Sequence, residues 1–135
     1  MSNKQIGSSF EQELCEMLSQ YGFWAHNLKA NNSGQPADII AAKNERAYLI
    51  DAKVCETDSF SLSRIEENQE LAMTLWEDCG NDVGWFAFKI GDEVYMLPHG
   101  YIKTERLSGA AMSVSRIAAV GIPFHRWCVY ADQHQ

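Results

Sequence analysis

Apolar side chains recur at helical spacing in two parts of the chain. The first part predicts a helix over residues 8–21, whose apolar stripe consists of Phe10, Leu14, Met17, Leu18 and Tyr21. Ser8 stands three residues before Glu11, which fits a capping box, and Gly22 stands where a left-handed helix cap is expected. The second part predicts a helix over residues 62–79, and the Gly-Asn dipeptide that follows ends it.

Shorter apolar and aromatic runs predict strands. The five runs cover residues 23–28, 38–42, 47–53, 85–90 and 94–97. A polar connection of hairpin length, residues 43–46, joins the second run to the third, and Gly91-Asp92 suits a tight hairpin between the last two. Residues 30–36 are polar and rich in turn-formers, which predicts a loop.

After Pro98 the pattern weakens, although residues 113–120 fit a short helix and residues 124–130 fit a last strand. The order helix, strand, strand, strand, helix, strand, strand predicts an α/β or α+β domain with one central mixed sheet flanked by helices. The chain has no repeats and no linker. We therefore expect a single domain over residues 1–135, with a core at about 7–97 and a C-terminal extension.

Composition excludes several classes of protein. A chain of 135 residues, 46% hydrophobic and 21% charged, is typical of a globular domain and not of a disordered, collagen-like or coiled-coil protein. The start of the chain lacks the apolar core of a secretory signal, and no apolar run approaches the ~18 residues of a membrane span, so we expect a cytoplasmic protein. The four cysteines have neither zinc-finger nor disulfide-framework spacing, and we expect free thiols.

The net charge bears on possible ligands. Eleven basic against 18 acidic residues give a formal charge of −7, which argues against a general phosphate-binding surface. Acidic side chains that together hold divalent cations would reverse the local potential that a phosphate meets. Acidic residues that lie close together are therefore the first candidates for a functional site.

The predicted strand at 47–53 ends in Asp51-Ala52-Lys53. Alternate side chains share one face of a strand, so Asp51 and Lys53 project together while Ala52 points the other way. A charge at the end of a buried strand is costly unless it is paired. The two charges are interpreted either as a structural ion pair or solvated strand end, or as part of a catalytic site.

Three further polar residues join this pair as candidates. Asp38 begins the neighbouring strand, where a hairpin brings it near Asp51, and two close carboxylates repel unless a cation or proton lies between them. Alternatively, Asp38 only ends the preceding turn. Glu11 lies on the apolar side of its predicted helix and Gln69 on the inward arc of the second helix. Their alternatives are local: a capping role for Glu11 and a backbone hydrogen bond for a buried Gln69.

Together these side chains suit phosphodiester hydrolysis. Asp38 and Asp51 can hold Mg²⁺, a hard cation that prefers oxygen ligands and usually keeps waters and a substrate phosphate. Lys53 would orient the attacking water or help to deprotonate it, and Glu11 would complete the metal shell.

Four segments, in this order, resemble the PD-(D/E)XK nuclease superfamily and, within it, the Holliday-junction resolvases. Residues 7–14 are similar to the opening helix with its catalytic Glu, residues 36–41 to the strand with the first metal-binding Asp, and residues 49–53 to the strand with the acid-x-Lys signature. Residues 60–65, followed by Asn68-Gln69, are similar to the entry of the second core helix, where a Gln often approaches the site. The chain departs from the family pattern at Asp51, where Glu is commoner, and in its acidic balance.

The resemblance implies a restriction-endonuclease-like core and a Mg²⁺-dependent DNA endonuclease, with Mn²⁺ able to substitute. It implies a homodimer acting on branched DNA such as a four-way junction, in a phage or mobile-element setting. The catalytic residues would be Glu11, Asp38, Asp51, Lys53 and Gln69, of which Glu11, Asp38 and Asp51 would bind the metal. The residues expected to contact DNA are Lys4, Lys29, Ser33, Arg46 and Arg64, with Lys103 as a further basic residue. The alternatives are a repair or restriction-like nuclease on linear or flap DNA and a non-catalytic DNA-binding module of the same fold.

Overall fold

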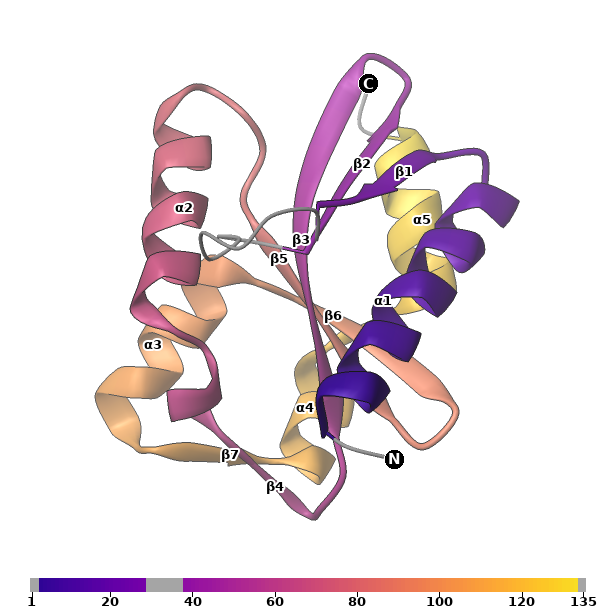
Figure 1. Ribbon diagram of the computed structural model, residues 1–135. Helices are drawn as coiled ribbons and strands as arrows, with labels where there is room; N and C mark the ends of the chain where they lie inside the picture. Colours follow the sequence, from indigo (N-terminus) through magenta and orange to yellow (C-terminus); the bar gives the residue numbers. More distant parts are fainter. Residues whose placement is uncertain (1–2, 29–37, 134–135) are drawn as a thin grey trace.

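The computed structural model describes residues 3–28 and 38–133, with the backbone alone at residues 3–5, 7–8 and 133. Figure 1 shows the described helices and strands. In order they are α1 (Asn3–Gln20), β1 (Trp24–Asn27), β2 (Ile39–Lys43), β3 (Arg46–Cys55), β4 (Ser59–Ser61), the 3-10 helix η1 (Leu62–Arg64), α2 (Glu67–Asp78), β5 (Trp85–Ile90), β6 (Glu93–Pro98), α3 (His99–Ser108), β7 (Ala111–Ser113), α4 (Val114–Val120), β8 (Ile122–Pro123) and α5 (Phe124–Gln133). None of the described helices is long and apolar enough to cross a membrane.

The described strands form one large mixed sheet, as the sequence predicts. Its order is β1-β2-β3-β5-β6-β8, and β4 and β7 pair separately. Strands β3 and β5 run parallel, whereas the other neighbours in the large sheet are antiparallel. The predicted hairpin between β2 and β3 turns at Asn44 and Glu45, whose φ angles of 54° and 67° are those of a type I′ turn. Gly91, with φ 59°, makes the predicted hairpin between β5 and β6.

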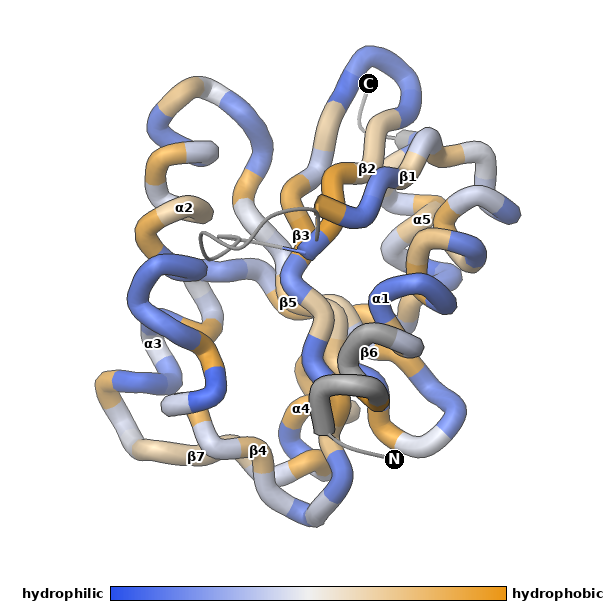
Figure 2. The backbone as a smooth tube through the Cα atoms, in the orientation of Figure 1, coloured by the Kyte–Doolittle hydropathy of each residue, from blue (hydrophilic) through white to orange (hydrophobic). Residues whose placement is uncertain are grey.

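Helices cover both faces of this sheet (Figure 1). One apolar cluster joins α1 and α5 to the face that carries Tyr48, Ile50 and Ala52 of β3. The other cluster joins η1, α2, α3 and α4 to the opposite face, which carries Leu49. Figure 2 shows hydrophobic residues concentrated in the central strands, while the tip of the β2–β3 hairpin is hydrophilic. The side chains of β3 therefore alternate between two buried layers.

The first two predicted helices differ from the observed ones at their ends. Helix α1 begins at Asn3, so Ser8 lies inside the helix, and the predicted capping box at Ser8 is wrong. Its other end is as predicted: Gly22 has φ 87°, and its N–H and that of Phe23 donate to the carbonyls of Ser19 and Leu18, which is a Schellman cap. The predicted helix over 62–79 is interrupted, because Ile65 is extended (φ −92°, ψ 109°) and α2 starts only at Glu67.

The chain beyond β6 differs most from expectation. Residues 124–130, predicted as a strand, belong to α5, because the buried side chains of Phe124, Trp127, Cys128 and Ala131 repeat at helical spacing. Helix α3 and the short strands were not predicted, whereas α4 lies where a short helix was expected. The cysteines are free thiols, as predicted.

Candidate active site

Asp51 and Lys53 lie on the face of β3 that α2 covers. The Asp51 side chain is 0% exposed, and the Lys53 ammonium lies 3.3 Å from its Oδ2. Ala52 packs into the cluster on the opposite face. The predicted alternation of these three residues is therefore confirmed, and it places a carboxylate and an ammonium side by side in the interior.

Asp38 stands immediately before β2 and is bound to strands on both sides. Its carbonyl accepts a hydrogen bond from Leu28 N–H (2.7 Å), and its own N–H donates to Ile50 (3.2 Å). Its carboxylate Oδ2 accepts the N–H of Ala52 at 2.8 Å. These bonds fix Asp38 beside Asp51, as the hairpin predicts, whereas its catalytic role stays a prediction. The preceding loop, with Pro36, lies outside the described residues.

The electrostatics of the Asp38–Asp51 pair favour an added positive charge. Burial raises the pKa of Asp51 well above its usual value, and the Asp38 carboxylate raises it further. Lys53 lowers that pKa, but its effect is smaller than those of burial and Asp38. The Lys53 ammonium, 3.3 Å from Asp51 Oδ2, supplies one positive charge to this oxygen. A divalent cation with oxygen ligands fits this pair, because it would relieve the repulsion and coordinate the remaining lone pairs.

Gln69 reaches the same point from α2. Its Oε1 accepts hydrogen bonds from Lys53 Nζ (3.2 Å) and from the N–H of Glu66 (3.0 Å). Its Nε2 lies 3.4 Å from Asp51 Oδ1. The backbone hydrogen bond expected of Gln69 is therefore present, and the same amide joins the N-terminus of α2 to the two charged residues of β3, whereas a catalytic role stays a prediction.

A partly buried polar cluster around the buried His99 attaches α2 to the rest of the fold, and sequence reasoning missed it. The ring nitrogens of His99, which is 0% exposed, lie 3.4 Å from Glu70 Oε1 and 3.3 Å from Glu77 Oε2. Glu70 also pairs with Arg106 of α3 at 3.0 Å, and Glu77 accepts the N–H of Gly84 at 2.8 Å. The partners lie on different elements, so no local pattern signals the cluster. It holds α2, and with it Gln69, against β5 and α3.

Glu11 lies on α1, which packs on the opposite face of the sheet from Asp51 and Lys53. Its side chain is half-buried, whereas Glu13 and Glu16 are exposed, in keeping with the predicted inward side. Its charge raises the pKa of the Cys15 thiol, after burial as the larger cause. Among the described residues no three His, Cys, Asp or Glu side chains gather closely enough to hold a metal. The acidic side chains that lie together at the site are therefore those of Asp38 and Asp51, and the metal role of Glu11 stays a prediction.

The residues expected to contact DNA do not gather on one described surface. Lys29 and Ser33 lie outside the described residues, as does the side chain of Lys4, and Lys103 is exposed on α3. Arg64 is nearest to the site: it donates to the Val54 carbonyl at 2.9 Å and covers the Phe60 ring at 4.8 Å.

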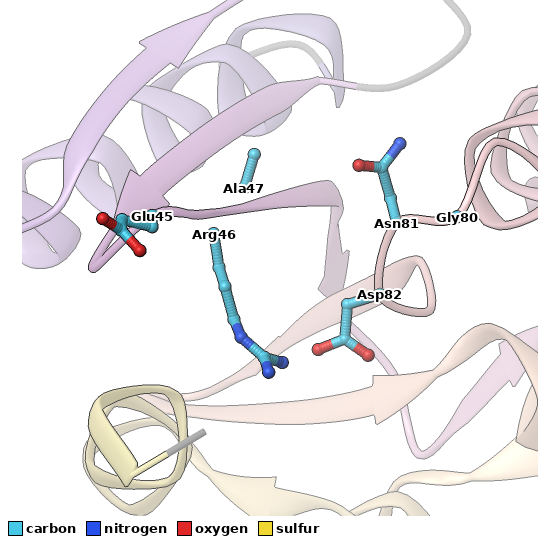
Figure 3. A pocket seen from close by; sticks show the side chains of 6 residues that line it. All are labelled: Glu45, Arg46, Ala47, Gly80, Asn81 and Asp82. Atoms are coloured by element: carbon cyan, nitrogen blue, oxygen red, sulfur yellow. The ribbon is translucent and has the colours of Figure 1, made fainter. Parts of the chain in front are cut away.

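Arg46 lies at the other end of β3. It lines a pocket of about 380 Å³ with Glu45 and Asp82, and its side chain extends toward that of Asp82 (Figure 3). It lies five positions before Asp51 in an extended strand, which places the two residues about 17 Å apart. Its charge is thus set among acids and away from the paired aspartates, and a role in DNA binding stays a prediction.

Comparison with known proteins identifies relatives of this chain. The family model described as archaeal Holliday junction resolvase (Hjc) matches residues 2–131. No curated protein matches the chain. Among solved structures, Hjc from Archaeoglobus fulgidus, described as a Holliday junction resolvase from an archaeal hyperthermophile, superposes with a TM-score of 0.69. That match has 20% sequence identity and covers 90% of this chain and 99% of the other, so it supports the fold alone.

Proposed function

This chain belongs to the archaeal Holliday junction resolvase family, whose members are endonucleases. We propose that it cuts four-way DNA junctions and that its active site contains Asp38, Asp51 and Lys53. The observation that supports this site most strongly is the buried Asp51, which stands between Asp38 and Lys53 and has a raised pKa. A buried carboxylate beside a second carboxylate stabilises a fold poorly, so a functional reason for the pair is the better explanation.

Resolvases of this type generally depend on a divalent metal, and we propose Mg²⁺, with Mn²⁺ able to replace it. Asp38 and Asp51 would hold the ion, whereas the metal role expected of Glu11 stays a prediction, because α1 packs on the opposite face of the sheet. The bound ion would neutralise charge on the phosphoryl oxygens and polarise the scissile phosphate. Oxygen ligands and a partly open coordination shell are what Mg²⁺ prefers.

Lys53 acts on the attacking water in this proposal. Its ammonium is fixed from two sides, by Asp51 at 3.3 Å and by Gln69 Oε1 at 3.2 Å. An ammonium so held can orient a water by donating a hydrogen bond, and its neutral amine form can accept a proton from the water at Nζ. Gln69 positions Lys53, because the same amide is anchored on the backbone of Glu66.

We further propose a homodimer, because a four-way junction offers two equivalent strands to cut. An apolar strip suitable for contact with a second copy lies on α2, where Leu71 and Leu75, one turn apart, are 56% and 65% exposed. Closed two-fold dimers use the same patch on both subunits. A DNA substrate is also in keeping with the expected cytoplasmic location.

The experiment is a cleavage assay of the purified protein on a four-way junction, a flap and a linear duplex of equal length, with Mg²⁺, with Mn²⁺ and with EDTA. We expect metal-dependent cleavage, fastest on the junction. Asp38→Asn should abolish cleavage, while the exposed-site control Glu13→Gln should keep it. Preference for the flap or the duplex would favour the repair or restriction-like alternative. Binding without cleavage in any metal would favour a non-catalytic module.

A further inference from the structure

Strand β1 carries an exposed aromatic pair. Trp24 is 63% exposed, and its ring stacks on that of His26 at 5.6 Å between centroids with an interplanar angle of 15°. The two residues alternate with Ala25, which packs against the α1–α5 cluster. A large, flat ring thus lies at the surface with one neighbouring ring stacked against it.

This pair lies on the same face of the sheet as Asp51 and Lys53. Trp24 pairs with Ala42 and His26 with Ile40, and Ile40 pairs in turn with Leu49, whose side chain shares its face with Asp51. Strand β1 is the edge strand of the sheet, next to the strand that Asp38 precedes (Figure 1).

The spacing along β1 suits a strand of nucleic acid. The Leu28 N–H bonds the Asp38 carbonyl, so that position marks the catalytic end of β1. Trp24 lies four residues back, which is about 14 Å at strand rise. That length corresponds to about four nucleotides of one duplex strand.

We propose that Trp24, backed by His26, is a stacking platform for a DNA base at the branch point of the four-way junction, and that it sets the preference for branched over linear DNA. This inference rests on the proposed function. Inside a linear duplex both faces of each base are covered by neighbours. At a branch point the stack is interrupted, so a base face becomes available to an aromatic ring.

Stacking also resolves the conflict between an acidic chain and an anionic substrate. The formal charge is −7, and of the described cations Lys43, Lys89 and Arg116 already pair with Asp132, Glu13 and Glu105. Affinity from phosphate neutralisation is therefore limited on the described surface. Stacking on an aromatic ring adds affinity without releasing counterions, so it is insensitive to salt.

The test measures binding of the full chain to a fluorescent four-way junction and to a linear duplex, in EDTA and at several salt concentrations. Trp24→Ala should weaken junction binding by about 5- to 150-fold, the range for loss of one stacked base, with little change for the duplex. The slope of log affinity against log salt should stay as in the wild type, because no phosphate contact is removed. Trp24→Phe should keep most of the affinity, and His26→Ala should cause a smaller loss than Trp24→Ala.

Leu107→Ala is the matched control, since Leu107 is an exposed apolar residue on α3. If the wild type cleaves the junction with Mg²⁺ and Trp24→Ala binds the junction as tightly as the wild type, the proposed stacking platform is overturned and the proposed function is not. A reduced salt slope would assign Trp24 to a phosphate contact and would also overturn it. If the wild type neither binds nor cleaves the junction, the platform and the proposed function both fail.

Discussion

Replacing Asp51 with Asn should stabilise the metal-free protein while abolishing its response to Mg²⁺. The carboxylate is 0% exposed, and burial and Asp38 raise its pKa well above the usual value. A group whose pKa is higher in the folded than in the unfolded state binds its proton more tightly when folded. Its contribution to stability is therefore fully present below the unfolded value of about 4 and is lost as the pH rises through the raised folded value.

Asn has nearly the shape of Asp but does not ionise, so Asp51→Asn removes this loss. In EDTA at pH 8 the variant should melt at a higher temperature than the wild type, and the difference should shrink toward pH 4. The opposite order at pH 8 would mean that the Lys53 ion pair outweighs burial and Asp38, and would refute the reasoning.

Metal binding supplies the second half of the prediction. A ligand at one hundred times its dissociation constant stabilises the folded state by about 2.7 kcal/mol. A chain of 135 residues has an unfolding entropy of about 280 cal/mol/K, so this corresponds to a rise in Tm of about 10 °C. The rise should appear in the wild type and in the exposed-site control Asp92→Asn, and should disappear in Asp51→Asn. An equal Mg²⁺ shift in Asp51→Asn, measured by calorimetry, would place the metal elsewhere.

Two further changes test how α2 supports the site. Gln69→Ala should lower the single-turnover cleavage rate by about 5- to 30-fold, equivalent to about 1–2 kcal/mol, without changing junction affinity, because it frees Lys53 rather than removing a DNA contact. The neighbouring, exposed Asn68→Ala is its control, and a loss of affinity instead of rate would contradict this role. Gly84→Ala should destabilise the fold by about 1–3 kcal/mol in urea unfolding, since a Cβ there would lie 2.6 Å from the side chain of Met73. In the double variant with Met73→Ala the two losses should be less than additive, and strict additivity would refute the clash.

The parts of the fold that the sequence predicts are those fixed by local chemistry. Gly22 ends α1, and the β2–β3 and β5–β6 turns lie at the expected polar and Gly-containing connections. The alternation of Asp51 and Lys53 on one face follows from strand geometry alone, and the nearness of Asp38 follows from the short hairpin. These local features are enough to assemble the paired aspartates.

The features that escaped prediction depend on contacts distant in sequence. Residues 124–130 are aromatic and apolar enough to suit a strand or a helix, and the helical repeat of Phe124, Trp127, Cys128 and Ala131 stands out only once their burial is known. His99 has no local signal, because its carboxylate partners lie on α2. The break between η1 and α2 is the exception, because it follows from a local contact at the start of the new helix at Glu67, where the Gln69 side chain bonds back to the Glu66 N–H.

The most direct test of the central claim compares the wild type with Lys53→Ala in single-turnover cleavage of a four-way junction, started by adding Mg²⁺ to the preformed complex. Lys53 touches both Asp51 and Gln69, so its loss removes the group that acts on the water and leaves the carboxylate pair in place. The account predicts that Lys53→Ala binds the junction as the wild type does but cleaves it at least about 100-fold more slowly. Cleavage at the wild-type rate would contradict it.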